Sequence, residues 1–110
     1  MKPQALHEER RKHPRFELIN LVIYKQFEIE EVTKTINLSM GGMQMSTEFP
    51  VPLDEELDIA IKIGNDIFRS QGKVIYANER EDGNFDIGVN FVNPPPESLN
   101  LLSQYLSQRE

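Results

Sequence analysis

The sequence has no cysteine, and its uninterrupted apolar stretches are only a few residues long. Without cysteine the chain has no disulfide, no thiol nucleophile, no iron–sulfur cluster and no thiolate zinc site. A membrane-spanning helix needs about 20 apolar residues, and the first 16 residues lack the apolar core of a secretory signal. We therefore predict a cytoplasmic protein that does not insert into a membrane.

Residues that support catalysis or bind metals are also scarce. The two histidines, His7 and His13, lie near the N-terminus, where no predicted element would orient a general base. The chain has neither a GxxxxGKS/T nor a GxGxxG phosphate-binding motif. The acidic residues 54–56 lack the ligand spacing of a calcium loop. We therefore predict no enzymatic activity, no metal site and no cofactor.

The 110 residues are enough for one domain, and the net charge of −6 is unevenly distributed. Residues 1–15 carry five cations and two anions, hence +3, and residues 16–110 carry seven cations and sixteen anions, hence −9. The acidic part argues against DNA, RNA and anionic membranes, because binding to them needs many cationic contacts. A basic segment on an acidic body favours a small anionic ligand, and a solvated basic tail is the alternative.

We predict a flexible basic arm over residues 1–16 and a folded body over residues 17–110. The arm has no hydrophobic periodicity and contains Pro3 and Pro14. Leucines spaced three and four residues apart predict a helix at 97–108, directly after three prolines that end the last strand. Alternating apolar residues separated by turn residues predict strands at 17–24, 28–37, 43–47, 57–63, 67–78 and 85–91.

These elements predict a mainly β fold, a small antiparallel six-stranded β-barrel with a C-terminal α-helix. Closing the sheet removes its exposed edges, and the helix would cover the one open end. Gly72 is predicted to form a β-bulge in the fifth strand. The pair Gly41 and Gly42 is predicted to supply the positive φ values of a turn after the second strand.

Two short motifs carry the strongest functional signal. One is RxxxR in the arm, and the other is NxSxxG in the turn after the second strand. Their defined positions are Arg11, Arg15, Asn37, Ser39 and Gly42. In this order, ahead of a small barrel with a closing helix, they make the chain resemble the PilZ domain family of bacterial cyclic di-GMP receptors. The resemblance, to the stand-alone single-domain type, covers residues 10–108 and includes a GxxF pattern at residues 88–91.

The resemblance implies that these five residues contact cyclic di-GMP, and the chemistry of the side chains fits this role. The planar fork of arginine pairs with phosphate oxygens or guanine edges, and its face stacks on a base. The amide of Asn37 and the hydroxyl of Ser39, two residues apart at a strand end, would point the same way and recognise a guanine edge. Without a Cβ at Gly42, the backbone would approach the ligand closely.

Two further residues have two interpretations each. Arg10 either engages a second ligand molecule, because this dinucleotide can stack as a dimer, or faces solvent. The ring of Tyr76 either lies near the site or packs within the barrel.

The sequence therefore predicts a non-catalytic receptor whose arm docks over the barrel when cyclic di-GMP binds. Docking would alter a surface that a protein effector of motility or biofilm regulation recognises; no oligomeric state is predicted. The alternative is an adaptor of the same fold that binds a motility or secretion component without nucleotide. An oligonucleotide-binding barrel fits less well, because Phe85, Phe91 and Tyr105 suit a core rather than an exposed stacking surface.

Overall fold

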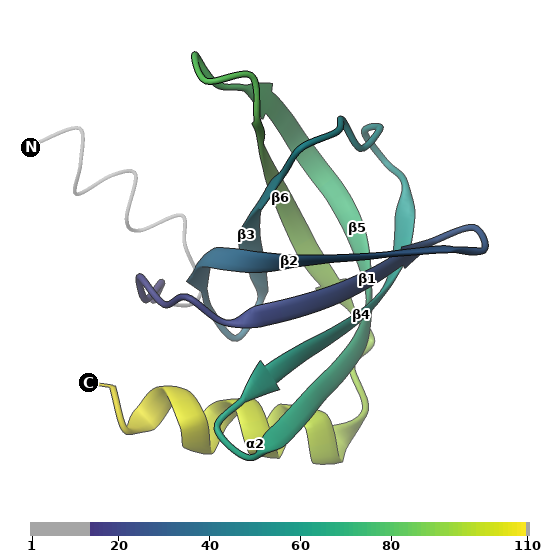
Figure 1. Ribbon diagram of the computed structural model, residues 1–110. Coiled ribbons are helices and arrows are strands. Elements are labelled where there is room, and N and C mark those ends of the chain that lie inside the picture. Colours follow the sequence, from purple (N-terminus) through teal and green to yellow (C-terminus); the bar gives the residue numbers. More distant parts are fainter. Residues whose placement is uncertain (1–13, 110) are drawn as a thin grey trace, which may run out of the picture.

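The computed structural model describes residues 14–109, which form a six-stranded antiparallel β-barrel followed by one α-helix (Figure 1). The elements are β1 (Leu21–Gln26), β2 (Ile29–Leu38), β3 (Gly42–Thr47), β4 (Glu56–Ile63), β5 (Asp66–Glu79), β6 (Phe85–Val92) and α2 (Pro96–Ser107). The predicted fold class is confirmed. The predicted arm lies outside the described residues except for its last three.

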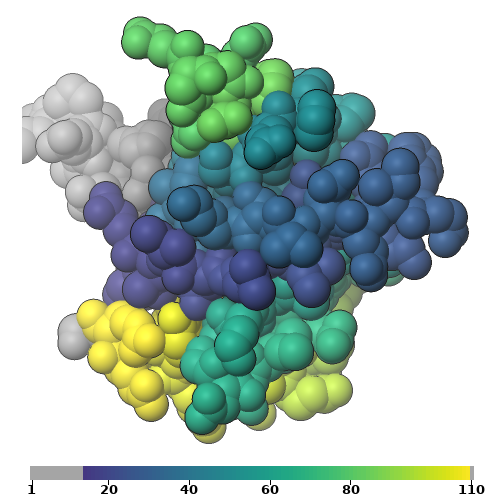
Figure 2. Space-filling view, in the orientation of Figure 1, coloured from purple at the N-terminus to yellow at the C-terminus, as the bar shows by residue number. Residues whose placement is uncertain are grey.

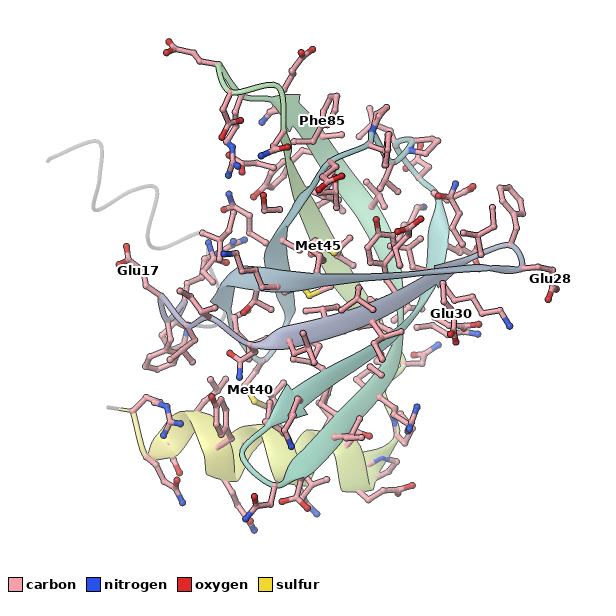
Figure 3. The ribbon with its side chains drawn as sticks, in the orientation of Figure 1. Glu17, Glu28, Glu30, Met40, Met45 and Phe85 are labelled. Atoms are coloured by element: carbon pink, nitrogen blue, oxygen red, sulfur yellow. The ribbon has the colours of Figure 1, made fainter. Side chains whose placement is uncertain are left out.

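The barrel is closed because every strand pairs with two neighbours. The strand order is β1–β2–β3–β6–β5–β4, and β4 pairs again with β1. Alternating side chains point inward, and Figure 3 shows Met45 between the strands. The predicted apolar row of β4 faces this core: Leu57, Ile59, Ile61 and Ile63. Among residues 14–109, no helix is long and apolar enough to cross a membrane.

Helix α2 covers one end of the barrel, where it packs against β4 and β5 (Figure 1). Pro96 lies in its first turn, where the missing N–H costs no hydrogen bond, and Glu97 adds a favourable negative charge. Leu102 and Leu106 are buried in the same apolar cluster as the barrel interior. The helix therefore completes the core.

The first strand begins at Leu21, four residues later than the predicted strand at 17–24. The reason is that a side-chain hydroxyl bonds backbone groups of residues 18–20, in place of regular backbone pairing with β2. The hydroxyl of Thr35 on β2 accepts a hydrogen bond from Asn20 N–H at 2.8 Å and donates one to Leu18 C=O at 2.6 Å. The chain before β1 therefore runs beside β2 without forming regular strand.

Gly72 does not form the predicted bulge. It pairs regularly with both neighbouring strands, and the register shift on β5 lies between Val74 and Tyr76. A Cβ on Gly72 would meet the side chains of Ile59 and Val89. Glycine is therefore needed here to leave room for core side chains, not to bend the strand.

Charged groups hold the turn between β5 and β6. Asp82 accepts a hydrogen bond from Asn84 N–H at 2.9 Å, and Arg80 pairs with Asp82 and Asp86 at 3.1 and 3.0 Å. The pKa of Asp82 lies below its ordinary value. The largest cause is the hydrogen bond from Asn84 N–H, and the second is the hydrogen bond from the Arg80 guanidinium. The ionised form of Asp82 is therefore the one that this turn favours.

Candidate functional site

A β-bulge on β2 decides which side chains of the NxSxxG motif face outward. Thr35 is buried opposite Met45, and the register then shifts by one residue at Ile36. In a regular strand Asn37 would share the inward face of Thr35, but after the bulge Asn37 faces outward and Leu38 enters the core. The bulge therefore presents the amide of Asn37 at the surface of the barrel.

Asn37 connects the segment before β1 to strand β3. Its Oδ1 accepts a hydrogen bond from Arg15 Nη1 at 3.3 Å, and its Nδ2 donates to Gln44 Oε1 at 3.0 Å. Gln44 lies directly opposite on β3. These two bonds orient the Asn37 amide, because its oxygen faces Arg15 and its NH2 group faces Gln44. Arg15 of the RxxxR motif therefore contacts Asn37 of the NxSxxG motif.

Arg15 is placed there by the backbone of the next residue. Phe16 and Leu38 exchange two backbone hydrogen bonds, each of 2.9 Å. Figure 3 labels Glu17 on this side of the barrel and Glu28 at the far tip of the β1–β2 hairpin. Arg15 is exposed. Since a guanidinium has five N–H donors, the single bond to Asn37 leaves capacity to bind an anion.

Ser39 is buried, and its hydroxyl holds the turn between β2 and β3. The Oγ accepts hydrogen bonds from Gly41 N–H and Gly42 N–H and donates to Gly42 C=O, each at 3.2 Å. The Ser39 N–H also donates to Gly42 C=O, at 2.9 Å. Direct contact of this hydroxyl with a ligand stays a prediction, and here the hydroxyl stabilises the turn that follows Asn37.

Gly42 lies where the backbone of β6 leaves no room for a side chain on β3. A Cβ at this position would come closer than 3.0 Å to the Val89 carbonyl oxygen and lie 3.2 Å from Asn90 Cα. The adjacent Gly41 C=O accepts a hydrogen bond from Phe91 N–H at 2.9 Å. The absence of a side chain at Gly42 is therefore a condition for pairing β3 with β6.

The predicted positive φ values at Gly41 and Gly42 are wrong. Among residues 14–109, the glycines with positive φ are Gly64 and Gly83, in the β4–β5 and β5–β6 turns. The β2–β3 turn is instead held by the Ser39 hydroxyl, which bonds three backbone groups.

Tyr76 packs within the barrel wall. Its ring lies against Gly88 on β6, where a Cβ would overlap the ring. The half-buried ring therefore occupies the space that this glycine leaves open.

A buried polar cluster, which the sequence analysis did not identify, adjoins β2. Asn20 is 6% exposed, and its Nδ2 donates to Tyr105 Oη at 2.8 Å and to Lys62 C=O at 2.9 Å. Its backbone N–H donates to the Thr35 hydroxyl. Asn20 therefore links the segment before β1 to α2 and β4. The available signal was a single amide within the otherwise apolar residues 18–23.

A cavity of about 310 Å³ lies further along β2 and β3, and its lining includes Lys34, Ser46 and Tyr24. The pKa of Tyr24 is raised above its ordinary value, mainly because the hydroxyl is partly buried and to a lesser extent because Glu31 is negatively charged. None of the described residues of the two motifs lines this cavity. Among residues 14–109, no group of three or more acidic or histidine side chains is placed to hold a metal ion.

Four of the six predicted ligand-binding residues are described by the structure. They are Arg15, Asn37, Ser39 and Gly42. The structure brings Arg15 to Asn37 and Ser39 to Gly42, at one end of β2. Arg10 and Arg11 lie outside the described residues. Gln44 was missed, because only the pairing of β2 with β3 places it beside Asn37.

Comparisons with known structures agree with this fold. The structure of MotI/DgrA, an inhibitor of motility from Bacillus subtilis, has 18% identity and a TM-score of 0.81, covering 91% of this chain and 51% of that chain. The PilZ domain of YcgR from Escherichia coli, solved with cyclic di-GMP, has 18% identity and a TM-score of 0.73, covering 91% and 92%. The MrkH–cyclic di-GMP complex of K. pneumoniae has 16% identity and a TM-score of 0.79, covering 91% and 52%.

This chain thus spans about half the length of MotI and MrkH, and these similarities show a shared fold. No curated protein matches the chain in sequence. The family model described as the PilZ domain matches residues 9–108, which is most of the chain. On this evidence of sequence, the chain belongs to the PilZ domain family.

Proposed function

We propose that this chain is a non-catalytic receptor for cyclic di-GMP. The observation that carries the proposal is the contact between Arg15 and Asn37, which joins one residue of each motif across 22 positions of sequence. Two of the structures that are similar in fold, the YcgR PilZ domain and MrkH, are solved with this ligand.

The chemistry of the two side chains suits the parts of this ligand, which has two phosphates and two guanines. The remaining N–H groups of Arg15 would pair with a phosphate or with guanine O6 and N7. Asn37, oriented by Gln44, would present its amide to a guanine edge. Ser39 and Gly42 would support this recognition, Gly42 by its close approach to β6 and Ser39 by holding the turn.

Arg11, which lies four positions before Arg15, would also bind the ligand. Four residues span at most about 14 Å, so the backbone anchor at Phe16 keeps Arg11 within reach of a ligand beside Asn37. Ordering five residues of the arm costs about 5–10 kcal/mol. Four to six charge-assisted hydrogen bonds of about 1.5–3 kcal/mol each, with base stacking, offset this cost. We expect an affinity near micromolar, and Arg10 would engage a second ligand molecule.

Docking of the arm would create the signal that an effector protein recognises. Since the similar B. subtilis protein is an inhibitor of motility, a motility component is the class of effector we propose. Amide hydrogen exchange across residues 5–16 should slow when cyclic di-GMP is added. Unchanged exchange with bound ligand would contradict docking while leaving the receptor function intact.

Calorimetric titration of cyclic di-GMP into the 110-residue chain tests the proposal. We expect saturable binding, which Arg15→Ala and Arg11→Ala each weaken at least about tenfold by removing charge-assisted bonds. Arg69→Ala removes an exposed arginine on β5 and should bind like the wild type, and GTP should not bind. Absence of binding at about 100 µM ligand, well above a micromolar dissociation constant, would refute the receptor function.

An adaptor of the same fold that acts without nucleotide is the second candidate. It is favoured by the apolar side chains of Leu21 and Ile23, which are exposed on the outer face of β1. Such an adaptor would bind its protein partner equally well with and without cyclic di-GMP, whereas a receptor would not.

A further inference from the structure

Apolar side chains are grouped on the outer face of four adjacent strands. Ile23 on β1 lies opposite Val32 on β2 and Ala60 on β4, so these three form a row across the barrel. Leu21 and Ile67 extend this group on β1 and β5, and four of the five residues are 39–64% exposed. Figure 2 shows β1 in purple between β2 in blue and the β4–β5 hairpin in teal on one face of the molecule.

Three cations accompany these apolar residues. Each is the direct cross-strand neighbour of one of them, in the pairs Leu21–Lys34, Ala60–Arg69 and Ile67–Lys62. None of the three cations takes part in the ion pairs found within residues 14–109. Together these side chains make up the basic–apolar face: Leu21, Ile23, Val32, Ala60, Ile67, Lys34, Lys62 and Arg69.

The charge of the basic–apolar face is opposite to that of the protein around it. The face carries three cations and no carboxylate, whereas residues 16–110 carry −9 in total. The carboxylates of Glu31 and Glu48 border the face at one edge, where they line a cavity together with Val32 and Lys34. The next outward row along these strands contains two carboxylates. Glu30 on β2 and Asp58 on β4 lie on either side of Lys25 on β1. An exposed apolar group of this kind marks an interaction site, and the unpaired cations indicate the charge of its partner.

We propose that the basic–apolar face binds an acidic amphipathic segment of another protein. The apolar side of such a segment would cover the row formed by Ile23, Val32 and Ala60, which removes apolar surface from water. Its carboxylates would pair with the three cations around that row. This interaction surface shares no residue with the Arg15–Asn37 site, and we expect it to bind its partner without nucleotide.

Charge and composition disfavour the other occupants. A second copy bound through the same face would bring three cations against three cations, because a two-fold interface pairs a surface with itself. Residues 1–13 of the chain carry four cations and two anions, so they have the same sign as the face. Nucleic acid would match the charge, but the face has no aromatic side chain on which bases stack.

The test uses the 110-residue chain without nucleotide and two synthetic helical peptides. One peptide has leucines on one side and glutamates on the other, and in the second peptide lysines replace the glutamates. Fluorescence anisotropy measures binding, and changes in amide NMR shifts map the contact. We expect only the glutamate peptide to bind, with shift changes grouped on β1, β2, β4 and β5.

Charge-reversal variants make the test specific. The double substitution Lys34→Glu, Lys62→Glu should weaken binding of the glutamate peptide at least about tenfold, since two attractions become repulsions. Lys73→Glu is the control for charge reversal elsewhere on the barrel, because Lys73 lies on β5 outside the face and pairs with Asp54. It should bind the peptide like the wild type. All these positions are exposed, so the melting temperatures should agree and exclude loss of the fold.

Several outcomes would overturn the proposal. Equal binding of both peptides, shift changes elsewhere, or unchanged affinity in the double variant would each do so. Binding to phosphatidylglycerol vesicles that the double variant abolishes, without binding of the glutamate peptide, would assign the face to a membrane instead. A dimer in sedimentation that Leu21→Ser dissociates would assign it to a second copy of the chain.

Discussion

Replacing Gly42 by alanine distinguishes two explanations for the glycine of the NxSxxG motif. If the glycine serves only the approach of a ligand, Gly42→Ala should lower affinity and leave stability unchanged. The structure instead places the missing Cβ against the Val89 carbonyl of β6. We therefore expect Gly42→Ala to destabilise the protein in the absence of any ligand.

The expected loss in the free energy of unfolding is about 2–4 kcal/mol. The new Cβ would meet the Val89 carbonyl oxygen and Asn90 Cα, which belong to the backbone and cannot rotate away. Overpacking of this kind costs about 1–3 kcal/mol. Separating β3 from β6 by about 1 Å to reach normal contact also breaks the 2.9 Å bond from Phe91 N–H to Gly41 C=O. Its loss adds about 0.5–1.5 kcal/mol.

Urea and thermal unfolding of the ligand-free protein measure this loss. For a domain of this size it lowers the melting temperature by about 8–20 °C. Arg15→Ala is the companion variant: its side chain is exposed, so it should lose affinity for cyclic di-GMP while its melting temperature changes by less than about 2 °C. A Gly42→Ala protein that unfolds like the wild type but does not bind would refute the packing argument.

Three further predictions concern other parts of the molecule. Asn20→Ala should lower the free energy of unfolding by about 2–3 kcal/mol in urea titrations, because buried partners lose their hydrogen bonds; a loss below about 0.5 kcal/mol would contradict this role. Gln44→Ala should weaken cyclic di-GMP binding several-fold in calorimetry by releasing Asn37, with an unchanged melting temperature; unaltered affinity would remove Gln44 from the site. The lowered pKa of Asp82 stabilises the fold above its unfolded pKa of about 3.9, and this contribution disappears as pH falls through the folded pKa. Urea midpoints between about pH 5 and pH 2 should therefore fall less steeply in Asp82→Asn than in Glu81→Gln, and equal slopes would count against it.

Most of the barrel was predictable because its later strands bury one face only. In β4 the apolar residues alternate with polar ones from Leu57 to Ile63, and glycine at position 64 marks the turn that follows. Three prolines separate the last strand from α2, whose leucines recur at helical spacing. Local turn signals and alternation agree with the closed barrel, which is the condition for prediction from sequence.

The bulges were not predictable, because they depend on the partner strand. At Ile36 and Ile75 one residue is inserted into the pairing with β3 and β6. Both inserted residues are apolar, so they resemble the other apolar residues of the strands, and the alternation does not reveal where the register changes. The late start of β1 has a similar origin, since it depends on the Thr35 hydroxyl bonding the backbone of a neighbouring segment.

The NxSxxG motif combines two physical roles that look alike in the sequence. Asn37 faces outward and contacts Arg15, whereas Ser39 and Gly42 satisfy the backbone of the turn and allow β6 to approach. Because the turn follows Asn37 directly, it also determines where the Asn37 amide lies. Loss of Ser39 or Gly42 would then reduce binding through the position of Asn37, in addition to the loss of any direct contact with the ligand. Affinity measured together with stability separates the two roles: a residue that contacts only the ligand changes affinity alone.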